Sequence, residues 1–223
     1  MPSQIPEVVV QRLPLYARTL AQLLNEQVEV ISSQELGERL QMTPAQIRKD
    51  LSYFGKFGKQ GRGYNVSHLL GVLRGILGLE RTWRLAVVGV GHLGQAIMAY
   101  GGFEPEGFQV VAAFDNNPQK IGQRIAGTLV QNIEELPGVL GRQEVDIGIV
   151  AVPAAAGQKV ASTLVEGGVR AILNYAPTTV RVPEGIKVRT IDPVLALQSM
   201  TFYLKSPEDA IPTAGRRRTR RRR

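Results

Sequence analysis

Three glycines at a fixed spacing are the clearest chemical signal in the chain. The stretch from Arg84 to Gly94 reads RLAVVGVGHLG, an apolar run that ends in Gly89, Gly91 and Gly94 as G-x-G-x-x-G. In this pattern the first glycine permits a tight turn, the second lets a pyrophosphate approach bare backbone, and the third permits close packing of a helix on a strand. A bound anion would lie at the helix N-terminus, where free N–H groups and the helix dipole favour negative charge. The stretch predicts a dinucleotide-binding loop.

A carboxylate follows at the distance that such a loop requires. A second apolar run, Val110 to Phe114, ends in Asp115, twenty-one residues after Gly94. A carboxylate at this point accepts hydrogen bonds from the adenosine ribose and repels a 2′-phosphate. The next three residues bring no Arg that would reverse this preference. We therefore predict NAD or NADH in preference to their phosphorylated forms; the alternative is that Asp115 only forms a turn.

A dinucleotide loop also suits a dehydrogenase, which needs a substrate pocket and an acid–base group. The candidates are His92 in the loop, His68 at a predicted helix start, and Tyr100 and Tyr175, which suit ring packing better. The chain has no Cys, which excludes thiolate ligands and Cys nucleophiles, and two His argue against a His-rich metal site. The sequence therefore favours binding without catalysis and without a metal.

A second chemical signal is a cluster of positive charge. The chain carries +8, but seven Arg lie in its last eight residues, and without them the charge would be +1. Residues 45–65 hold five Lys or Arg against one acid, a net +4, whereas residues 1–44 carry −2. A local cluster of this kind indicates a polyanionic partner. The terminal Arg run is predicted to be disordered, and it either strengthens nonspecific DNA binding or is an incidental solvated end.

The elements around the basic cluster indicate how it would be used. A first amphipathic helix is predicted from Glu7 to Leu24, on the spacing of Leu13, Ala17, Leu20 and Leu24. A capping box at Ser32–Glu35 starts a second helix, and Thr43 with Pro44 starts a third that runs to about Phe54. Two short helices joined by about three residues are typical of a helix-turn-helix.

The third predicted helix presents a basic face. It would bury Ile47, Leu51 and Phe54 and expose Ala45, Lys49, Ser52 and Tyr53, with Gln46 and Arg48 on the flanks. Glycines alternating with Lys56, Lys59 and Arg62 then predict a basic hairpin, the wing of a winged helix. A merely solvated face is the alternative. We expect Gln46 and Lys49 at base edges or the nearby DNA backbone, and the remaining contacts mostly at phosphates. The residues predicted to contact DNA are Gln46, Arg48, Lys49, Ser52, Lys56, Lys59, Arg62 and Tyr64.

The rest of the chain alternates strands with helices. Ser67 is expected to cap a helix that closes the first domain near Gly78. Beyond the glycine loop, strands are predicted at 146–152, 169–174 and 187–191, and helices at 154–166 and 192–204. Alternation of this kind implies a parallel, doubly wound sheet with right-handed crossovers. The expected fold class is α/β, a winged helix-turn-helix domain followed by a Rossmann-type domain.

The order of these motifs resembles the Rex family of redox-sensing transcriptional repressors. The resemblance rests on RKDLSYFGKFGKQGRGY from Arg48 to Tyr64, on GVGHLG, on FDNNPQKIG from Phe114 to Gly122, and on ILNYAP from Ile172 to Pro177. It runs from about Val8 to Leu204. The chain departs from some members in having His92 within the loop, where they have Arg, and Pro193, where they have an aromatic residue.

The resemblance implies a homodimer that binds a palindromic operator in double-stranded DNA and releases it when NADH binds. It also implies that the C-terminal helix is exchanged between subunits, and that Arg18 and Asp192 form an intersubunit contact that depends on redox state, with Tyr100 at the nicotinamide end. The implied cofactor-binding residues are Gly89, Val90, Gly91, His92, Leu93, Gly94, Tyr100, Asp115, Asn116, Lys120, Val152, Pro153 and Asn174.

The expected organisation has four parts. Residues 1–80 form the DNA-binding domain, 81–191 the NAD(H)-binding domain, 192–205 the swapped helix and 206–223 the Arg-rich tail. Charges interrupt every apolar stretch at the N-terminus, and no run approaches the roughly 18 apolar residues of a membrane span, so a cytoplasmic protein is expected. Two rival functions stay open: a nicotinamide-dependent enzyme, and a nucleotide-binding module whose winged helix contacts protein.

Overall fold

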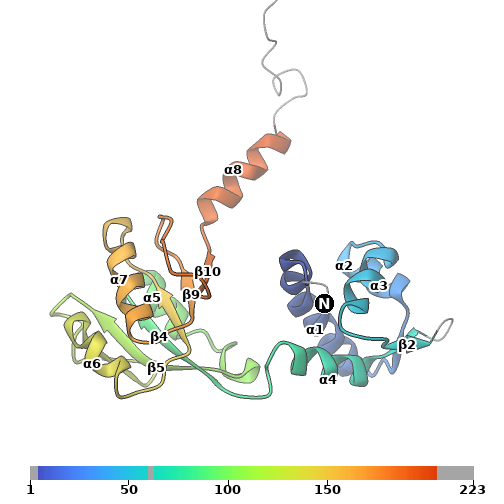
Figure 1. Ribbon diagram of the computed structural model, residues 1–223, viewed down its shortest axis with the longest axis horizontal. Helices are drawn as coiled ribbons and strands as arrows, with labels where there is room; N and C mark the ends of the chain where they lie inside the picture. The colour runs from blue at the N-terminus through green and yellow to red at the C-terminus, as the bar shows by residue number, and fades with distance from the viewer. Residues whose placement is uncertain (1–4, 60–62, 205–223) are drawn as a thin grey trace, which may run out of the picture. The chain divides into compact units, whose positions relative to one another are not determined.

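The computed structural model describes residues 5–59 and 63–204, which divide into two compact units with their boundary in the chain between Thr82 and Trp83. Figure 1 shows the elements of both units in chain order. Arg62, which is predicted to contact DNA, lies outside the described residues. So does the Arg-rich tail, which is predicted to be disordered.

The first unit contains four helices and a small sheet within its described residues. Its elements are α1 (Glu7–Asn25), β1 (Val30–Ile31), α2 (Ser33–Leu40), α3 (Pro44–Ser52), β2 (Gly58–Lys59), β3 (Gly63–Asn65) and α4 (Val66–Ile76). The three strands pair antiparallel in the order β1-β3-β2. Gly63 has φ +71°, and a side chain there would meet the carbonyl oxygen of Ile31 at 2.6 Å. A glycine is therefore required where the hairpin joins β1.

Both predicted helix starts of the helix-turn-helix are confirmed. Ser32 accepts a hydrogen bond from the Glu35 N–H, Glu35 accepts one from the Ser32 N–H, and Thr43 accepts one from the Gln46 N–H. The third helix ends at Ser52, earlier than predicted, because the N–H groups of Tyr53 and Phe54 bond three residues back and tighten the last turn.

Three predictions for this unit are wrong in detail. Leu24 is 45% exposed, since it lies in the last turn of α1, and Leu23 and Tyr16 are buried in its place. The cap of α4 is Asn65, whose Oδ1 accepts from the His68 N–H at 2.8 Å, so Ser67 lies inside the helix. Phe54 is only half-buried, although Ile47 and Leu51 are buried as predicted.

The second unit is a seven-stranded sheet with helices on both faces. Its strands are β4 (Trp83–Val88), β5 (Phe108–Asp115), β6 (Arg124–Ile125), β7 (Thr128–Asn132), β8 (Ile147–Val150), β9 (Ala171–Asn174) and β10 (Lys187–Thr190). The order is β10-β9-β8-β4-β5-β7-β6, parallel throughout except for the β6–β7 pair. Six strands in this order form a Rossmann sheet, as predicted.

Three of the four α-helices in the described part of this unit pack on the sheet, whereas the last, α8 (Pro193–Leu204), has no buried residue. The three are α5 (His92–Met98), α6 (Leu136–Leu140) and α7 (Ala154–Glu166), and the unit also has 3-10 turns at Glu104–Glu106 and Ile133–Glu135. Residues of α6 and α7 pack with Ala86 and Val88 of β4, whereas α5 packs with Leu85 and Val87. Successive strand residues point to opposite faces, so the two helix sets lie on opposite faces.

The sequence did not predict β6 and β7. Between β5 and β7 the chain forms only turns and the short β6, where a Rossmann fold commonly has a helix. Because no helix covers β7 at this point, Val130 is the one residue of the strand that is buried. The strand accordingly lacks a long apolar run. The usual hydrophobic pattern of a parallel strand is therefore absent.

Candidate functional site

The three glycines of the loop perform three different tasks. Gly89 follows β4 with φ +92°, and a side chain there would collide with the carbonyl of Ala151 at the end of β8. Gly94 lies in α5 against the carbonyl of Gly89, where a side chain has no space. A Cβ built on Gly91 has no neighbouring atom within 4 Å. Gly91 therefore leaves open the space that a bound pyrophosphate would need.

Asp115 is fixed beside this loop. Its side chain is 7% exposed; Oδ2 accepts from the Val90 N–H at 2.7 Å and Oδ1 from the Asn117 N–H at 2.8 Å. The Lys120 ammonium lies 3.4 Å from Oδ2. Burial would raise the pKa of Asp115, but the N–H groups of Asn117 and Val90 and the charge of Lys120 outweigh it and lower the pKa. The carboxylate is charged at neutral pH.

These groups line a pocket of about 600 Å³ at the carboxyl ends of β4, β5 and β8. The chain continues from β4 to β5 on one side and from β8 to β9 on the other, so the pocket lies at the switch point of the sheet. Seven of the predicted cofactor residues line it: Gly89, Gly91, Asp115, Asn116, Lys120, Val152 and Pro153.

The remaining predicted cofactor residues do not line this pocket. The side chain of Val90 is buried, although its N–H donates to Asp115. Gly94 packs against the carbonyl of Gly89 and does not line the pocket. His92 and Leu93 are exposed in the first turn of α5. Their assignment to the cofactor stays a prediction that rests on the resemblance.

Asn174 is fully buried and already engaged. Its Nδ2 donates to the carbonyls of Ala176 and Thr178 at 3.2 and 2.9 Å, and its Oδ1 accepts from the Ala176 N–H at 3.0 Å. The side chain thus holds the loop after β9.

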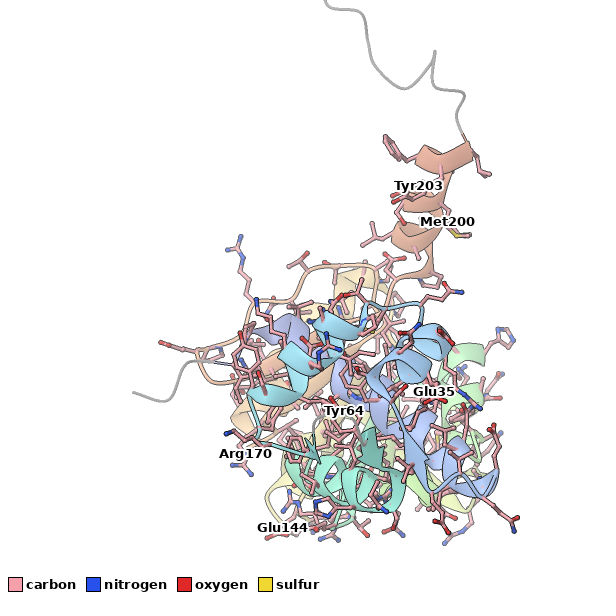
Figure 2. The ribbon with its side chains drawn as sticks, turned by 90° about the vertical axis from the view of Figure 1, so that its right-hand side faces the viewer. Glu35, Tyr64, Glu144, Arg170, Met200 and Tyr203 are labelled. Carbon is pink, nitrogen blue, oxygen red and sulfur yellow. The ribbon has the colours of Figure 1, made fainter. Side chains whose placement is uncertain are left out.

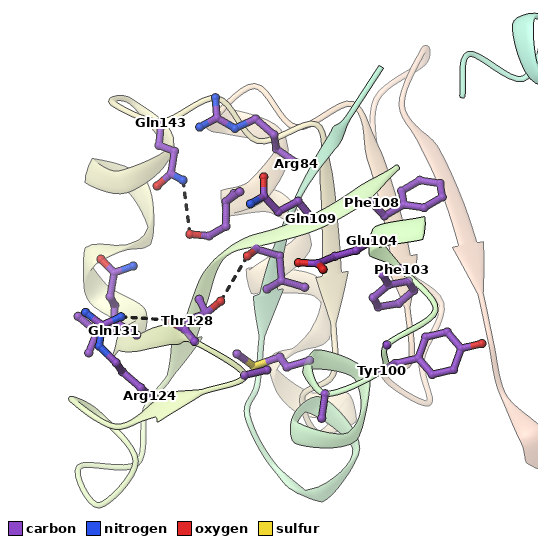
Figure 3. A pocket seen from close by; sticks show the side chains of 18 residues that line it. Arg84, Tyr100, Phe103, Glu104, Phe108, Gln109, Arg124, Thr128, Gln131 and Gln143 are labelled. Carbon is purple, nitrogen blue, oxygen red and sulfur yellow. Dashed lines mark hydrogen bonds between the residues drawn. The ribbon is translucent and has the colours of Figure 1, made fainter. Parts of the chain in front are cut away.

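Tyr100 lies at a different hollow. It is 61% exposed and lines a hollow of about 760 Å³ (Figure 3), where its ring and that of Phe103 pack edge-to-face with their centroids 5.2 Å apart. Arg84, Gln109 and Thr128, at the beginnings of β4, β5 and β7, also line this hollow. The structure does not bring Tyr100 into the glycine-loop pocket.

Sequence reasoning missed much of the pocket wall. Parts of α6 and α7 and the turn before α6 supply it: Ile133, Glu134, Leu136, Pro137, Ala156, Lys159, Val160 and Thr163. Three of these recur at helical spacing along α7 (Ala156, Val160 and Thr163), and the sequence predicted that helix with the same bounds. The helical spacing could have assigned one face of α7 to the pocket.

In the first unit the predicted basic face is present on α3. Arg48, Lys49 and Ser52 are exposed and Gln46 is half-buried. The Arg48 guanidinium donates to Ser33 Oγ at 2.8 Å, and the Ser52 hydroxyl donates to the Lys49 carbonyl at 2.7 Å. Exposed Lys56 follows the helix, and Lys59 lies in β2. The helix thus presents cations on a short, rigid element.

A groove of about 890 Å³ connects the start of α2, the exposed side of α3 and the hairpin. Ser32, Ser33, Arg48, Ser52, Lys56 and Tyr64 are among the residues that line it. Tyr64, which the sequence assigns to DNA contact, is 9% exposed and packs in the core of the unit, and burial raises the pKa of its hydroxyl. Its buried ring contributes mainly to packing; Tyr64 belongs to β3 and is labelled in Figure 2.

The predicted switch residues belong to different units. Arg18 is exposed on α1. Asp192 precedes α8, and its Oδ1 accepts from the Val194 N–H at 2.9 Å, which caps the helix. Their predicted contact joins two subunits and stays a prediction.

Helix α8 has no buried residue within the chain. Its exposed apolar side chains include Met200 and Tyr203, which point outward from the helix in Figure 2. The large exposed apolar residues of α8 are Val194, Leu195, Leu197, Met200, Phe202, Tyr203 and Leu204. Apolar surface of this extent indicates an interaction site.

Residues 5–59 and 63–204 contain neither a helix fit to span a membrane nor a cluster fit to hold a metal ion. No helix in these ranges combines the length and the apolar character needed to cross a membrane. No group of three or more His, Asp or Glu in the same ranges is arranged to hold a metal ion.

Comparisons with known proteins cover both units. Residues 4–52 match the family described as "Putative DNA-binding protein N-terminus", and residues 80–178 match "CoA binding domain". The chain is 58% identical over 199 residues to the redox-sensing transcriptional repressor Rex of Roseiflexus sp. (strain RS-1), covering 89% of this chain and 90% of that protein. It is 55% identical over 202 residues to the Rex of Chloroflexus aggregans, covering 91% and 95%.

Solved structures agree with these relatives. The crystal structure of RSP in complex with β-NAD⁺ and operator DNA has a TM-score of 0.87 and 39% identity, covering 91% of this chain and 93% of that chain. The structure of RSP in complex with β-NADH has a TM-score of 0.82 and 36% identity, covering 91% and 95%. Given this similarity across both units, the chain belongs to the Rex family of redox-sensing transcriptional repressors.

Proposed function

We propose that this repressor binds a palindromic operator as a homodimer and releases it when NADH occupies the glycine-loop pocket, so that it reads the NADH/NAD ratio. The observation that carries the proposal is the combination within one chain of the pocket around Gly91 and Asp115 with the basic face of α3. The matched RSP structures contain β-NAD⁺ with operator DNA, and β-NADH, which supports both ligands.

The pocket residues fit a dinucleotide. The open space at Gly91 admits a pyrophosphate to the N-terminus of α5, and Asp115 supplies a charged acceptor for a ribose hydroxyl. The N–H groups of Asn117 and Val90, together with the ammonium of Lys120, keep that carboxylate charged. NADH supplies the redox information, and the chain's own residues bind and orient it.

The dimer would use α8. An isolated apolar helix is costly to leave in water, at about 25 cal/mol per Å² of apolar surface. A second copy that buries α8 removes this cost, and mutual exchange of the helix gives a closed twofold assembly. A twofold dimer presents two α3 helices, which suits a palindromic operator. Such a target would place the protein in the cytoplasm with the DNA.

Regulation follows from linkage. If DNA and NADH prefer different arrangements of the dimer, each weakens the binding of the other by the same factor. Arg18 and Asp192 are the residues proposed to make the contact that differs between those arrangements. No turnover of a substrate is proposed, because the relatives are repressors.

The decisive experiment is a gel-shift assay on a library of palindromic promoter fragments, with NADH and NAD added in separate arms. Release by NADH alone supports the proposal, and the absence of any specific shift overturns it. A parallel assay follows NADH oxidation with a panel of small carbonyl compounds. Steady oxidation there would support the rival enzyme.

A further inference from the structure

The recognition helix α3 carries a buried acid. Asp50 is 2% exposed and follows Lys49, the residue proposed to reach a base edge. It is also the one acid between residues 45 and 65. A lone carboxylate beside a DNA-binding face would repel phosphates, and a buried charge is costly unless it is paired. The contacts of Asp50 therefore decide what it does.

Two residues of α1 hold Asp50. The Arg12 guanidinium donates to both carboxylate oxygens, through Nε to Oδ2 at 2.6 Å and through Nη2 to Oδ1 at 2.8 Å. The Tyr16 hydroxyl, which is fully buried, donates to Oδ2 at 2.6 Å. A bidentate guanidinium fixes orientation as well as distance. Arg12, Tyr16 and Asp50 thus form a clamp between α1 and α3.

The clamp lies at one edge of the buried stripe of α3. At about 100° per residue, Ile47 and Leu51 form the centre of that stripe and Asp50 lies at its edge toward Gln46. At the opposite edge, Arg48 donates to Ser33 Oγ on α2 at 2.8 Å. Apolar contacts are non-directional and permit small rotations of a short helix about its axis. Directed polar contacts at both edges resist such rotation.

The clamp also adjoins the residues that would read bases. A groove of about 370 Å³ is lined by Arg12 and Asp50 together with Gln46 and Lys49. A rotation of α3 about its axis would displace Gln46 and Lys49 sideways, because both project from the outer half of the helix. Base-edge contacts depend on geometry far more than phosphate contacts do.

We propose that Arg12, Tyr16 and Asp50 are positioning residues that set the rotation of α3 against α1 and thereby the sequence specificity of operator binding. This inference rests on the proposed function, since it assumes specific DNA binding. It assigns none of the three residues to contact with DNA. It predicts that loss of the clamp weakens operator binding more than nonspecific binding.

The test compares Arg12→Met and Asp50→Asn with a matched control, Arg39→Met. Arg39 makes a bidentate pair with Glu26 at 3.0 and 2.7 Å in the same unit, but both side chains are exposed and neither lies on α3. Fluorescence anisotropy gives the Kd of each full-length protein for operator and for scrambled duplex at one salt concentration. The readout is the specificity ratio, which is the Kd for scrambled duplex divided by the Kd for operator. Both values are measured well below each variant's Tm.

We expect the clamp variants to reduce the ratio about tenfold, a typical effect of one misplaced base contact, and Arg39→Met to leave it unchanged. A purely structural role would lower the Tm of the clamp variants and preserve the ratio, and that result would overturn the inference. Tyr16→Phe removes only the hydroxyl that donates to Asp50 and keeps the buried ring, so it decides the question if Arg12→Met and Asp50→Asn fail to fold. An unchanged ratio in Tyr16→Phe would then overturn the inference.

Measurements on the wild type and on the clamp variants distinguish a failure of this inference from a failure of the proposed function. If the wild-type chain shows no preference for any palindromic duplex, the proposed function fails and the inference with it. If the wild type is specific and responds to NADH while the clamp variants keep its ratio, only the inference fails.

Discussion

The carboxylate of Asp115 accepts a hydrogen bond at 2.7 Å from the backbone N–H of Val90. This contact ties the acid that ends β5 to the loop that follows β4, so the ribose acceptor and the pyrophosphate space at Gly91 are held in one geometry. A rigid arrangement of this kind reduces the entropy lost when a dinucleotide binds.

Replacing Asp115 should change the cofactor preference. In Asp115→Ser the Lys120 ammonium loses its carboxylate partner and can pair with a 2′-phosphate. We expect the affinity for NADH to fall about tenfold and NADPH to bind more tightly than NADH. Fluorescence titration with both nucleotides measures this. Asp146→Asn is the control, because Asp146 accepts from the Arg84 N–H at the amino ends of β4 and β8, opposite to the pocket. Equal wild-type affinities for NADH and NADPH would contradict the assignment.

Two alanine substitutions in the loop should separate binding from folding. Gly91→Ala places a methyl group in open space, so we expect an unchanged Tm and a loss of roughly tenfold or more in NADH affinity. Gly94→Ala forces a methyl group against the Gly89 carbonyl and should cost on the order of 1–3 kcal/mol of stability. Calorimetry and NADH titration of both variants check this. Full NADH affinity in Gly91→Ala would show that the pyrophosphate lies elsewhere.

Removing a phosphate-contacting cation should weaken DNA binding at every sequence. For Lys56→Ala we expect lower affinity for operator and scrambled duplex alike, and a salt slope reduced by about one. Lys49→Ala should instead lose mainly operator affinity. Anisotropy titrations over a range of salt concentrations measure both effects, with Lys187→Ala on β10 as the control. Identical behaviour of the Lys49 and Lys56 variants would refute the division of roles.

The clamp at Asp50 should make stability depend on acid pH. Burial would raise the pKa of Asp50, but the hydrogen bonds from Arg12 and Tyr16 outweigh it, so the pKa is lowered in the folded state. The stabilisation is therefore complete above the unfolded value of about 4 and is lost as the pH falls through the folded value.

Urea unfolding of the wild type and of Asp50→Asn, followed by circular dichroism, tests this from about pH 6 to about pH 3. The wild type should lose more of its free energy of unfolding over that range than the variant. Parallel curves would show that Asp50 titrates alike in the folded and unfolded states.

The predicted subunit switch can be tested at Asp192. Asp192→Asn keeps an oxygen that can cap α8 at the Val194 N–H but removes the charge proposed to meet Arg18. We expect NADH to bind with little change while its effect on operator affinity falls several-fold. Operator titrations with and without NADH measure this coupling. Glu184→Gln is a control of the same kind, because Glu184 is exposed in the loop before β10. NADH-driven release at wild-type strength in Asp192→Asn would exclude the contact.

Local patterns were sufficient for much of the fold. The capping residues at Ser32 and Thr43 start their helices as predicted, because an N-cap is a contact within four residues. The bounds of α7 at Ala154–Glu166 were predicted from an Ala-rich run that ends at two glycines. The glycine spacing placed the dinucleotide loop between a strand and a helix for the same reason.

The sequence by itself thus determined the two-part architecture, the loop at Gly91 and the basic face of α3, since these depend on residue type and short spacing. Tertiary structure alone decided which distant residues meet. It buried Asn174, brought Lys159 to the pocket wall and joined Asp50 to Arg12 across 38 positions of the chain. Contacts between distant residues depend on how helices and strands pack, and no local pattern encodes that packing.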